Sequence, residues 1–184
     1  MHKSPHQRIV VIGCSGSGKT TLARNIAART GSAYIELDAL HWGPNWTEVP
    51  DELMRERVRL AVQGERWTVD GNYRVVRDII WPRATTIVWL DYPFPLVAWR
   101  IFSRTVLRGI RRMELWNGNR ESLRTAFLSR NSILLWMLQT HGKVRREYQA
   151  FLSRPPYPHL AVVHIQTPRQ AREWLAGLPE HEEE

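Results

Sequence analysis

Apolar residues fall into five short runs separated by longer stretches with helical spacing. The runs are rich in β-branched residues, and such runs are typical of strands buried on both faces of a sheet. The strands are predicted at residues 8–12, 33–37, 66–69, 85–90 and 160–165. Helices are predicted at residues 22–30, 50–64, 73–81, 93–113, about 121–152 and 168–178. This alternation indicates an α/β fold with a parallel sheet covered by helices on both faces.

Four of the predicted strands are followed at once by a glycine or an aspartate. Gly13, Asp38, Asp70 and Asp91 each stand just past an apolar run, and Asp38 leads into an aromatic loop at residues 40–46. In open parallel sheets, ligands bind beside the carboxyl ends of the strands. We therefore expect a ligand site at this edge of the sheet.

Residues 13–20 match the phosphate-loop pattern G-x-x-x-x-G-K-[ST] in full. The glycines let the backbone curl so that successive N–H groups point at phosphate oxygens, and the loop leads into the N-terminus of a helix, which favours anions. Lys19 is expected to reach the β- and γ-phosphates of ATP, and Thr20 to ligate Mg²⁺. The predicted ATP site consists of Gly13, Ser15, Gly16, Ser17, Gly18, Lys19, Thr20 and Thr21.

Phosphoryl transfer needs a carboxylate near the Mg²⁺ shell and often a second one that orients the attacking oxygen. By apolar content alone, the strand before Asp91 is the best match to a Walker B pattern. The neighbours of Asp38 and Asp70 favour these two for function. Each aspartate could instead cap a helix or stabilise a turn.

The predicted helix at residues 93–113 carries arginines along one face and apolar residues along the other. The arginines are Arg100, Arg104, Arg108, Arg111 and Arg112. The apolar face, expected to pack on the core, holds Trp99, Phe102, Val106, Ile110 and Met113. One interpretation is a lid at about residues 107–122, with hinges at Gly109 and residues 117–119, whose arginines neutralise charge in the transition state. The alternative is a solvated basic face.

Composition sets the class of protein. The 184 residues and 21.6 kDa suit one domain, taken as residues 1–184, and the single cysteine excludes an intrachain disulfide and favours a cytoplasmic setting. No apolar run is long enough to span a membrane. The net charge of +8, almost all of it from arginine, favours anionic partners, including weak contact with nucleic acid that does not depend on base sequence. Trp67, Trp89 and Trp99 are expected in the core, and residues 180–184 as a frayed acidic tail.

The phosphate loop, together with YIELDALHWGPNW, WTVDGNYR, WLDYPFP and ELWNGNRES, resembles adenylate-kinase-related P-loop proteins over residues 8–165. More narrowly it is similar to the group named DNA topology modulation proteins. The resemblance implies strand order 2-3-1-4-5 and a helical lid. Adenylate kinases carry D-G-F-P-R after the third strand, where Asp supports the Mg²⁺ shell and Arg grips the acceptor phosphate; Asp70 and Arg74 match. Asn72 and Tyr73 replace the Phe-Pro pair, a departure that leaves the acceptor open.

Proteins resembling shikimate kinase use an aspartate after the second strand to contact the acceptor hydroxyl, which implies that role for Asp38. Trp42 and Trp46 could stack on a planar or sugar-like acceptor, or simply hold their loop in place. The sequence therefore predicts an ATP- and Mg²⁺-dependent phosphotransferase acting on a nucleotide or a hydroxyl metabolite. Its predicted catalytic residues are Lys19, Asp38, Asp70, Arg104, Arg108 and Arg112. Acceptor binding is assigned to Asp38, Trp42 and Arg74, and metal binding to Thr20 and Asp70.

The alternative function is that of an ATP-binding regulatory or DNA-associated protein in which the nucleotide acts as a switch. No motif that specifies the base decides between ATP and GTP. The identity of the acceptor and the oligomeric state are also open at this level.

Overall fold

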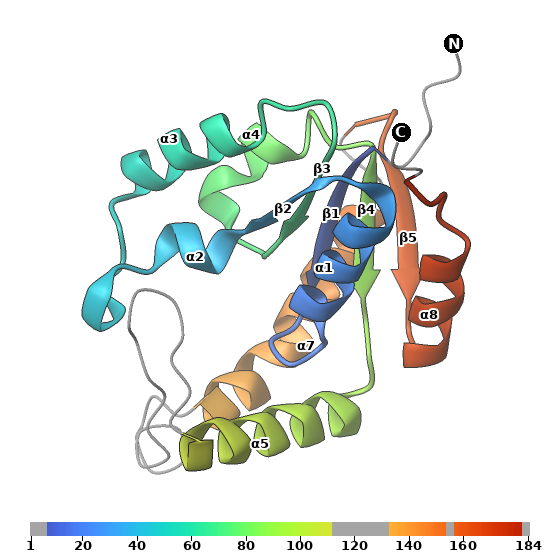
Figure 1. The fold of residues 1–184 in the computed structure, drawn as a ribbon. Coiled ribbons are helices and arrows are strands. Elements are labelled where there is room, and N and C mark those ends of the chain that lie inside the picture. Colours follow the sequence, from blue (N-terminus) through green and yellow to red (C-terminus); the bar gives the residue numbers. More distant parts are fainter. Residues whose placement is uncertain (1–6, 112–132, 154–156, 182–184) are drawn as a thin grey trace.

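The chain forms one five-stranded parallel sheet in the computed structural model, which describes residues 7–111, 133–153 and 157–181. The strands are β1 (Arg8–Gly13), β2 (Ala33–Glu36), β3 (Trp67–Asp70), β4 (Thr86–Leu90) and β5 (Ala161–Ile165). They lie in the order β2-β3-β1-β4-β5 (Figure 1). The predicted fold class and strand order are confirmed.

Helices cover both faces of the sheet (Figure 1). They are α1 (Lys19–Thr30), α2 (Leu37–His41), α3 (Asp51–Ala61), α4 (Arg77–Ile80), α5 (Phe94–Arg111), α7 (Ile133–Leu152) and α8 (Pro168–Ala176). Two short 3-10 turns are η1 (Pro44–Trp46) and η2 (Arg74–Val76). No helix in the described ranges is long and apolar enough to cross a membrane.

Alternate side chains of β1 enter two separate hydrophobic cores. Val10 and Ile12 pack into the core on the side of α3, α4 and α7. Ile9 and Val11 pack into the opposite core with α1, α5 and α8. Successive side chains of a strand point to opposite faces, and helices cover both faces of this sheet, so both sets are buried. This is why the central strand is a continuous apolar run in the sequence.

The strand register gathers the polar strand ends at one edge. β1 lies between β3 and β4, with Val11 opposite Asp70 and Gly13 opposite Leu90. β2 pairs with β3 so that Glu36 is opposite Asp70. The phosphate loop, Asp70 and the residues after Glu36 therefore leave the sheet side by side.

The aromatic segment after β2 corrects one prediction. The second strand ends at Glu36 rather than residue 37, and Asp38 lies in the first turn of α2. Residues 40 and 41, predicted as the start of the aromatic loop, belong to the same helix. The reason lies in the neighbouring strand: β3 ends at Asp70, so the ladder has no partner for a longer β2. Leu37 turns into the core, where it is 1% exposed and packs beside Gly71.

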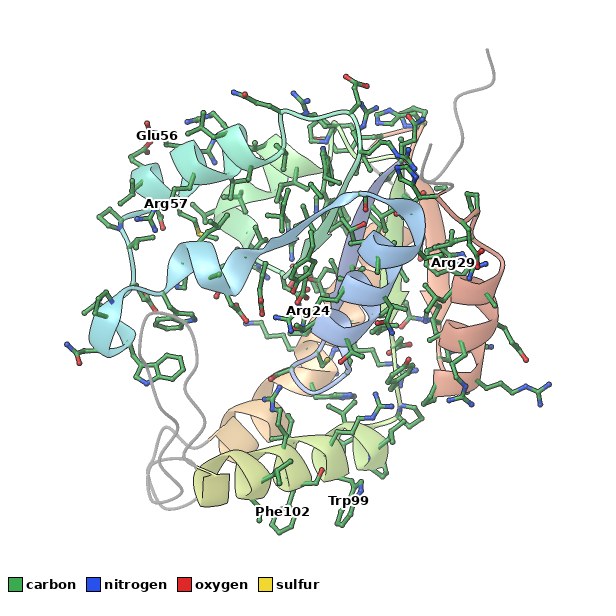
Figure 2. The ribbon with its side chains drawn as sticks, in the orientation of Figure 1. Arg24, Arg29, Glu56, Arg57, Trp99 and Phe102 are labelled. Atoms are coloured by element: carbon green, nitrogen blue, oxygen red, sulfur yellow. The ribbon has the colours of Figure 1, made fainter. Side chains whose placement is uncertain are left out.

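The face of α5 that was expected in the core is the wrong one. Trp99 and Phe102 are 66% and 45% exposed, and their side chains project away from the sheet (Figure 2). Among the side chains of this helix that the structure describes, Val97 and Ile101 are fully buried, and Ile101 packs against the phosphate loop. Helical spacing allows either apolar stripe of α5 to face the core. Contact with the phosphate loop buries the stripe of Val97 and Ile101. Trp67 and Trp89 are buried as predicted.

The prediction of a frayed tail over residues 180–184 is wrong for its first two residues. Arg29 at the end of α1 forms an ion pair with Glu180 at 2.8 Å, and its backbone oxygen accepts a hydrogen bond from the His181 N–H at 2.8 Å. Arg29 also donates to the backbone oxygens of Ala176 and Leu178 at the end of α8. Figure 2 shows Arg29 between the two helices. Glu180 and His181 are therefore part of the folded structure.

Candidate phosphate and acceptor site

The phosphate loop has the backbone that its glycines allow. Gly16 and Gly18 adopt φ angles of +77° and +92°, in the left-handed region that other residues rarely enter. A Cβ atom on Gly16 would lie 2.4 Å from Cγ1 of Ile101, so α5 leaves no room for one. Gly18 directly precedes α1, which places the N-terminus of that helix at the loop. The local geometry is that of an anion-binding loop.

The structure brings together the two residues predicted to bind metal. Thr20, in the first turn of α1, donates a hydrogen bond of 2.6 Å from its Oγ1 to Oδ2 of Asp70, the last residue of β3. Oδ1 of Asp70 is buried and has no hydrogen-bond partner among the described residues. A hydroxyl and a carboxylate with a spare oxygen are ligands that suit Mg²⁺, which usually takes one or two protein groups and completes its shell with phosphates and water. These residues fit the ion.

Lys19 lies across the same loop. Its Nζ donates to the backbone oxygen of Cys14 at 3.2 Å. Burial raises the pKa of Asp70, and the charges of Asp38 and Glu36 act in the same direction. The Lys19 charge and the hydrogen bond from Thr20 oppose that rise. Nearby positive charge, such as that of Lys19, therefore favours the ionised form of Asp70.

Asp91, the alternative Walker B aspartate, has different partners. It is buried just past β4, forms an ion pair with Arg145 at 2.9 Å and lies at hydrogen-bonding distance from Nε2 of His164, 3.0 Å away. The His164 ring also stacks on Trp89, with ring centroids 4.2 Å apart. Asp70, and not Asp91, contacts the phosphate-loop threonine.

Asp38 and the aromatic residues after β2 form a second part of the site. The Tyr73 hydroxyl donates a hydrogen bond of 2.6 Å to Oδ1 of Asp38. The His41 ring lies 4.5 Å from the Tyr73 ring and 4.7 Å from that of Trp42, centroid to centroid. Trp42 in turn meets Trp46 edge to face at 5.6 Å. The Trp42 predicted for acceptor binding therefore belongs to a connected aromatic group beside Asp38.

Two residues that sequence reasoning left unassigned hold the phosphate loop in place. Asn72 bonds to Gly13 twice: its Oδ1 accepts from the Gly13 N–H at 3.2 Å, and its Nδ2 donates to the Gly13 oxygen at 2.5 Å. Arg100 donates to the Ser17 oxygen at 2.9 Å and lies over the Tyr92 ring. The sequence offered a signal for Asn72, because this residue departs from the D-G-F-P-R pattern. For Arg100, only the row of arginines on α5 hinted at a role.

Arg74, predicted to bind the acceptor, is paired with Glu147 of α7. The same carboxylate accepts from Arg77 at 3.1 Å, and Arg77 also donates to the Tyr148 hydroxyl at 2.9 Å. Of the predicted lid arginines, Arg104 is half-buried on α5. The side chain of Arg108, all of Arg112 and most of the predicted lid at residues 107–122 lie outside the described residues.

Comparisons with known proteins agree with this geometry. Residues 9–81 match the AAA family, ATPases associated with various cellular activities. No curated protein matches the chain in sequence. Among solved structures, a gluconokinase from Sinorhizobium meliloti 1021 is similar with a TM-score of 0.50 and 22% identity, over 94% of this chain and 92% of that one. A candidate kinase from Chloroflexus aurantiacus j-10-fl is similar with a TM-score of 0.52 and 16% identity, over 94% and 96%.

The sheet order, the phosphate loop and these likenesses define the class of protein. The chain has the P-loop NTPase fold, with kinases among its structural neighbours. At such identities the likeness concerns the fold, and activity has to be argued from the site.

Proposed function

We propose that this chain is a phosphotransferase that moves the γ-phosphoryl group of ATP to a small-molecule acceptor in the presence of Mg²⁺. The observation that carries the proposal is the hydrogen bond from Thr20 to Asp70 at the mouth of a complete phosphate loop. A second carboxylate, Asp38, lies in the first turn of α2, just past the end of the neighbouring strand β2, and can serve a hydroxyl acceptor. A pure nucleotide switch has no need of this second carboxylate.

Each group has a role that follows from its chemistry. The loop N–H groups and Lys19 bind the β- and γ-phosphates, and Asn72 and Arg100 keep the loop in its binding shape. Thr20 and Asp70 hold Mg²⁺, which when bound neutralises phosphate charge. Asp38 receives the acceptor. Arg104, Arg108 and Arg112 are assigned to charge neutralisation and Arg74 to the acceptor side, as the sequence suggests.

The test is ADP release from Mg-ATP across a panel of nucleoside monophosphates, sugars, polyols and hydroxy acids. One class of acceptor is expected to raise turnover by at least about 100-fold, an effect of the size that a positioned acid–base group supplies. Lys19→Ala should abolish the stimulation and leave the fold intact by circular dichroism. If ATP binds but no acceptor stimulates turnover, the phosphotransferase assignment is wrong.

An exposed aromatic pair favours a second candidate, an ATP-dependent protein that contacts single-stranded nucleic acid. The rings of Trp99 and Phe102 are stacked with centroids 6.2 Å apart, on the helix α5, whose charged residues are all arginines. Aromatic faces beside cations bind bases by stacking, worth about 1–3 kcal/mol per base. Binding of a fluorescent oligothymidine should weaken steeply with salt and weaken further in Trp99→Ala/Phe102→Ala. Binding that the double substitution leaves unchanged would exclude this candidate.

A further inference from the structure

The groups beside Asp70 define a second chemical environment, distinct from the phosphate loop. Glu36 is opposite Asp70 in the β2–β3 register, and Asp38 follows two residues later. Tyr73 follows Asp70 by three residues and reaches back to Asp38 with a hydrogen bond of 2.6 Å. Asp38 is close enough to Asp70 for its charge to affect the pKa of that carboxyl. The Asp38–Tyr73 pair therefore lies at the same edge of the sheet as Asp70 and the phosphate loop.

The hydrogen bond keeps one carboxylate oxygen of Asp38 occupied. Burial and the neighbouring Asp38 charge raise the pKa of Tyr73 well above its usual range, so Tyr73 stays protonated and remains a donor. Asp38 Oδ1 is thus committed to Tyr73. The second oxygen, Oδ2, is the one that geometry assigns to an incoming group. Tyr73 acts as a positioning residue, since it acts through Asp38.

The aromatic group beside Asp38 is held by a tight loop. The His41 oxygen accepts from the Val49 N–H at 3.0 Å, and the Gly43 N–H donates to the Thr47 oxygen at 2.7 Å. Between these bonds, Asn45 and Trp46 both adopt left-handed φ angles, 55° and 57°, a conformation unfavourable by roughly 1–2 kcal/mol per residue. The loop holds the tryptophans in place despite this cost. Aromatic faces beside a carboxylate bind the C–H surface and the hydroxyls of carbohydrate-like molecules.

The charges on this side disfavour an anionic acceptor. Asp38 and Glu48 both place carboxylates near the Tyr73 hydroxyl, and a phosphate or carboxylate on the acceptor would be repelled by them. Three arginines near this side, among the residues that the structure describes, are engaged with protein groups: Arg74 and Arg77 share Glu147, and Arg57 donates to the Leu40 oxygen at 3.0 Å. The charge of Glu147 weakens the attraction of Arg74 for an anionic acceptor.

We propose that the acceptor is an uncharged, polyhydroxylated molecule of carbohydrate type, received by Asp38 and lying against the rings of His41, Trp42 and Tyr73. This inference rests on the phosphotransferase function proposed above. The acceptor hydroxyl gives its proton to Oδ2 of Asp38 as its oxygen forms the new bond to the γ-phosphorus. The bond from that phosphorus to the β,γ-bridging oxygen breaks, and ADP leaves with the electron pair. Asp38 then returns the proton to water.

The experiment uses the full chain with Mg-ATP and matched pairs of acceptors. D-Glucitol is compared with D-gluconate, and D-ribose with D-ribose 5-phosphate, because each pair differs mainly in one anionic group. AMP, CMP and dTMP complete the anionic set. Phosphorus NMR identifies a new phosphate monoester on a hydroxyl acceptor or a new diphosphate on a nucleotide, and coupled ADP release gives kcat and KM. The neutral member of a pair is expected to be phosphorylated with a kcat/KM at least about tenfold higher, the effect of about 1.4 kcal/mol of charge repulsion.

Five variants separate the roles of the residues. Asp38→Asn should lower kcat by about 10²–10⁴-fold, as expected for loss of a general base. Tyr73→Phe should lower kcat for the neutral acceptor and leave the KM for ATP unchanged. Trp42→Ala should raise the acceptor KM alone, with recovery in Trp42→Phe. Leu60→Ala, at a residue 61% exposed on α3, is the matched control and should match the wild type.

The outcomes separate the two proposals. Phosphorylation of the neutral acceptors supports the inference. If only the anionic members are phosphorylated, the phosphotransferase function stands and the inference is overturned. Glu147→Gln adds an independent check, because freeing Arg74 should then improve the KM for those anions. If no member of either set is phosphorylated, the proposed function fails, and this inference fails with it.

Discussion

At the scale of single residues, Asp70 is the position where burial and chemistry oppose each other most directly. It is 4% exposed, and burial raises its pKa. A pKa raised in the folded state means that the folded protein holds the proton more tightly than the unfolded chain does. The ionised carboxylate therefore lowers stability at every pH above the usual range of an aspartate. Binding of Mg²⁺ by Asp70 would explain why a carboxylate stands at this buried position.

Asp70→Asn should accordingly raise the melting temperature at pH 7 while lowering acceptor-dependent turnover by about 10²-fold or more. The gain in stability should shrink as the pH falls towards 4, because the wild-type carboxyl then becomes protonated and loses its disadvantage. Thermal unfolding across this pH range, with ADP release measured alongside, checks both statements. A loss of stability at pH 7 would show that the Thr20–Asp70 bond outweighs the buried charge.

At the scale of elements, the contact between the phosphate loop and α5 decides the geometry of the site. Ile101 of α5 fills the space above Gly16, and Arg100 from the preceding position reaches the Ser17 oxygen. One turn of helix thus supports the loop through both packing and a hydrogen bond. The same contact turns Trp99 and Phe102 outward, as Figure 2 shows.

Gly16→Ala should weaken ATP binding by at least about tenfold, because a left-handed backbone costs a residue with Cβ about 1–2 kcal/mol and the new methyl group also meets Ile101. Adding Ile101→Ala should restore only part of the affinity, since it relieves the clash but not the backbone conformation. Gly64→Ala is the control, as nothing lies within 4 Å of a Cβ there. Isothermal titration with ATP gives the three affinities. Full restoration in the double variant would show that the clash alone matters.

The orientation of α5 has its own test in unfolding experiments. Ile101→Ala should lower the free energy of unfolding by about 2–5 kcal/mol, the usual effect of deleting a buried aliphatic side chain. Trp99→Ala should change it by no more than about 0.5 kcal/mol, because that side chain is mostly exposed. Urea unfolding followed by circular dichroism measures both. Reversed values would mean that α5 packs on its tryptophan face.

At the scale of the whole molecule, the C-terminal end of the described chain packs against the first helix. α1 follows the first strand, and α8 and the residues after it close onto the end of α1 through Arg29 (Figure 2). The helix that presents Lys19 and Thr20 at its N-terminus is thereby anchored at its C-terminus. The sheet between the two cores holds the strand ends in fixed positions relative to this helix.

Arg29→Ala should lower the free energy of unfolding by about 1–3 kcal/mol, since it leaves backbone oxygens of α8 without their charged donor. Arg24→Ala, which removes the exposed ion pair to Glu36 from the same helix, should cost less than about 1 kcal/mol. Both values come from urea unfolding. Equal effects of the two substitutions would indicate that the α1–α8 contact adds nothing beyond a surface ion pair.

Local pattern was a good guide wherever function depends on neighbouring residues. Residues 13–20 form the loop that their glycines predict, and the buried strands lie where the apolar runs stand. The same reasoning chose the wrong face of α5, extended the second strand one residue too far and predicted fraying at residues 180 and 181. In each case a distant partner decided the outcome: the phosphate loop for α5, the end of β3 for the end of β2, and Arg29 for the residues after α8.

The sequence by itself determined the alternation of strands and helices, the phosphate loop and the set of candidate aspartates, because backbone preference and apolar spacing act over a few residues. Only the tertiary structure decided which aspartate serves the loop. Thr20 and Asp70 are 50 positions apart, and Asp38 and Tyr73 are 35 apart. Such pairs meet through the strand register and the packing of the two cores. The burial of the whole sheet sets that register, which no single segment encodes.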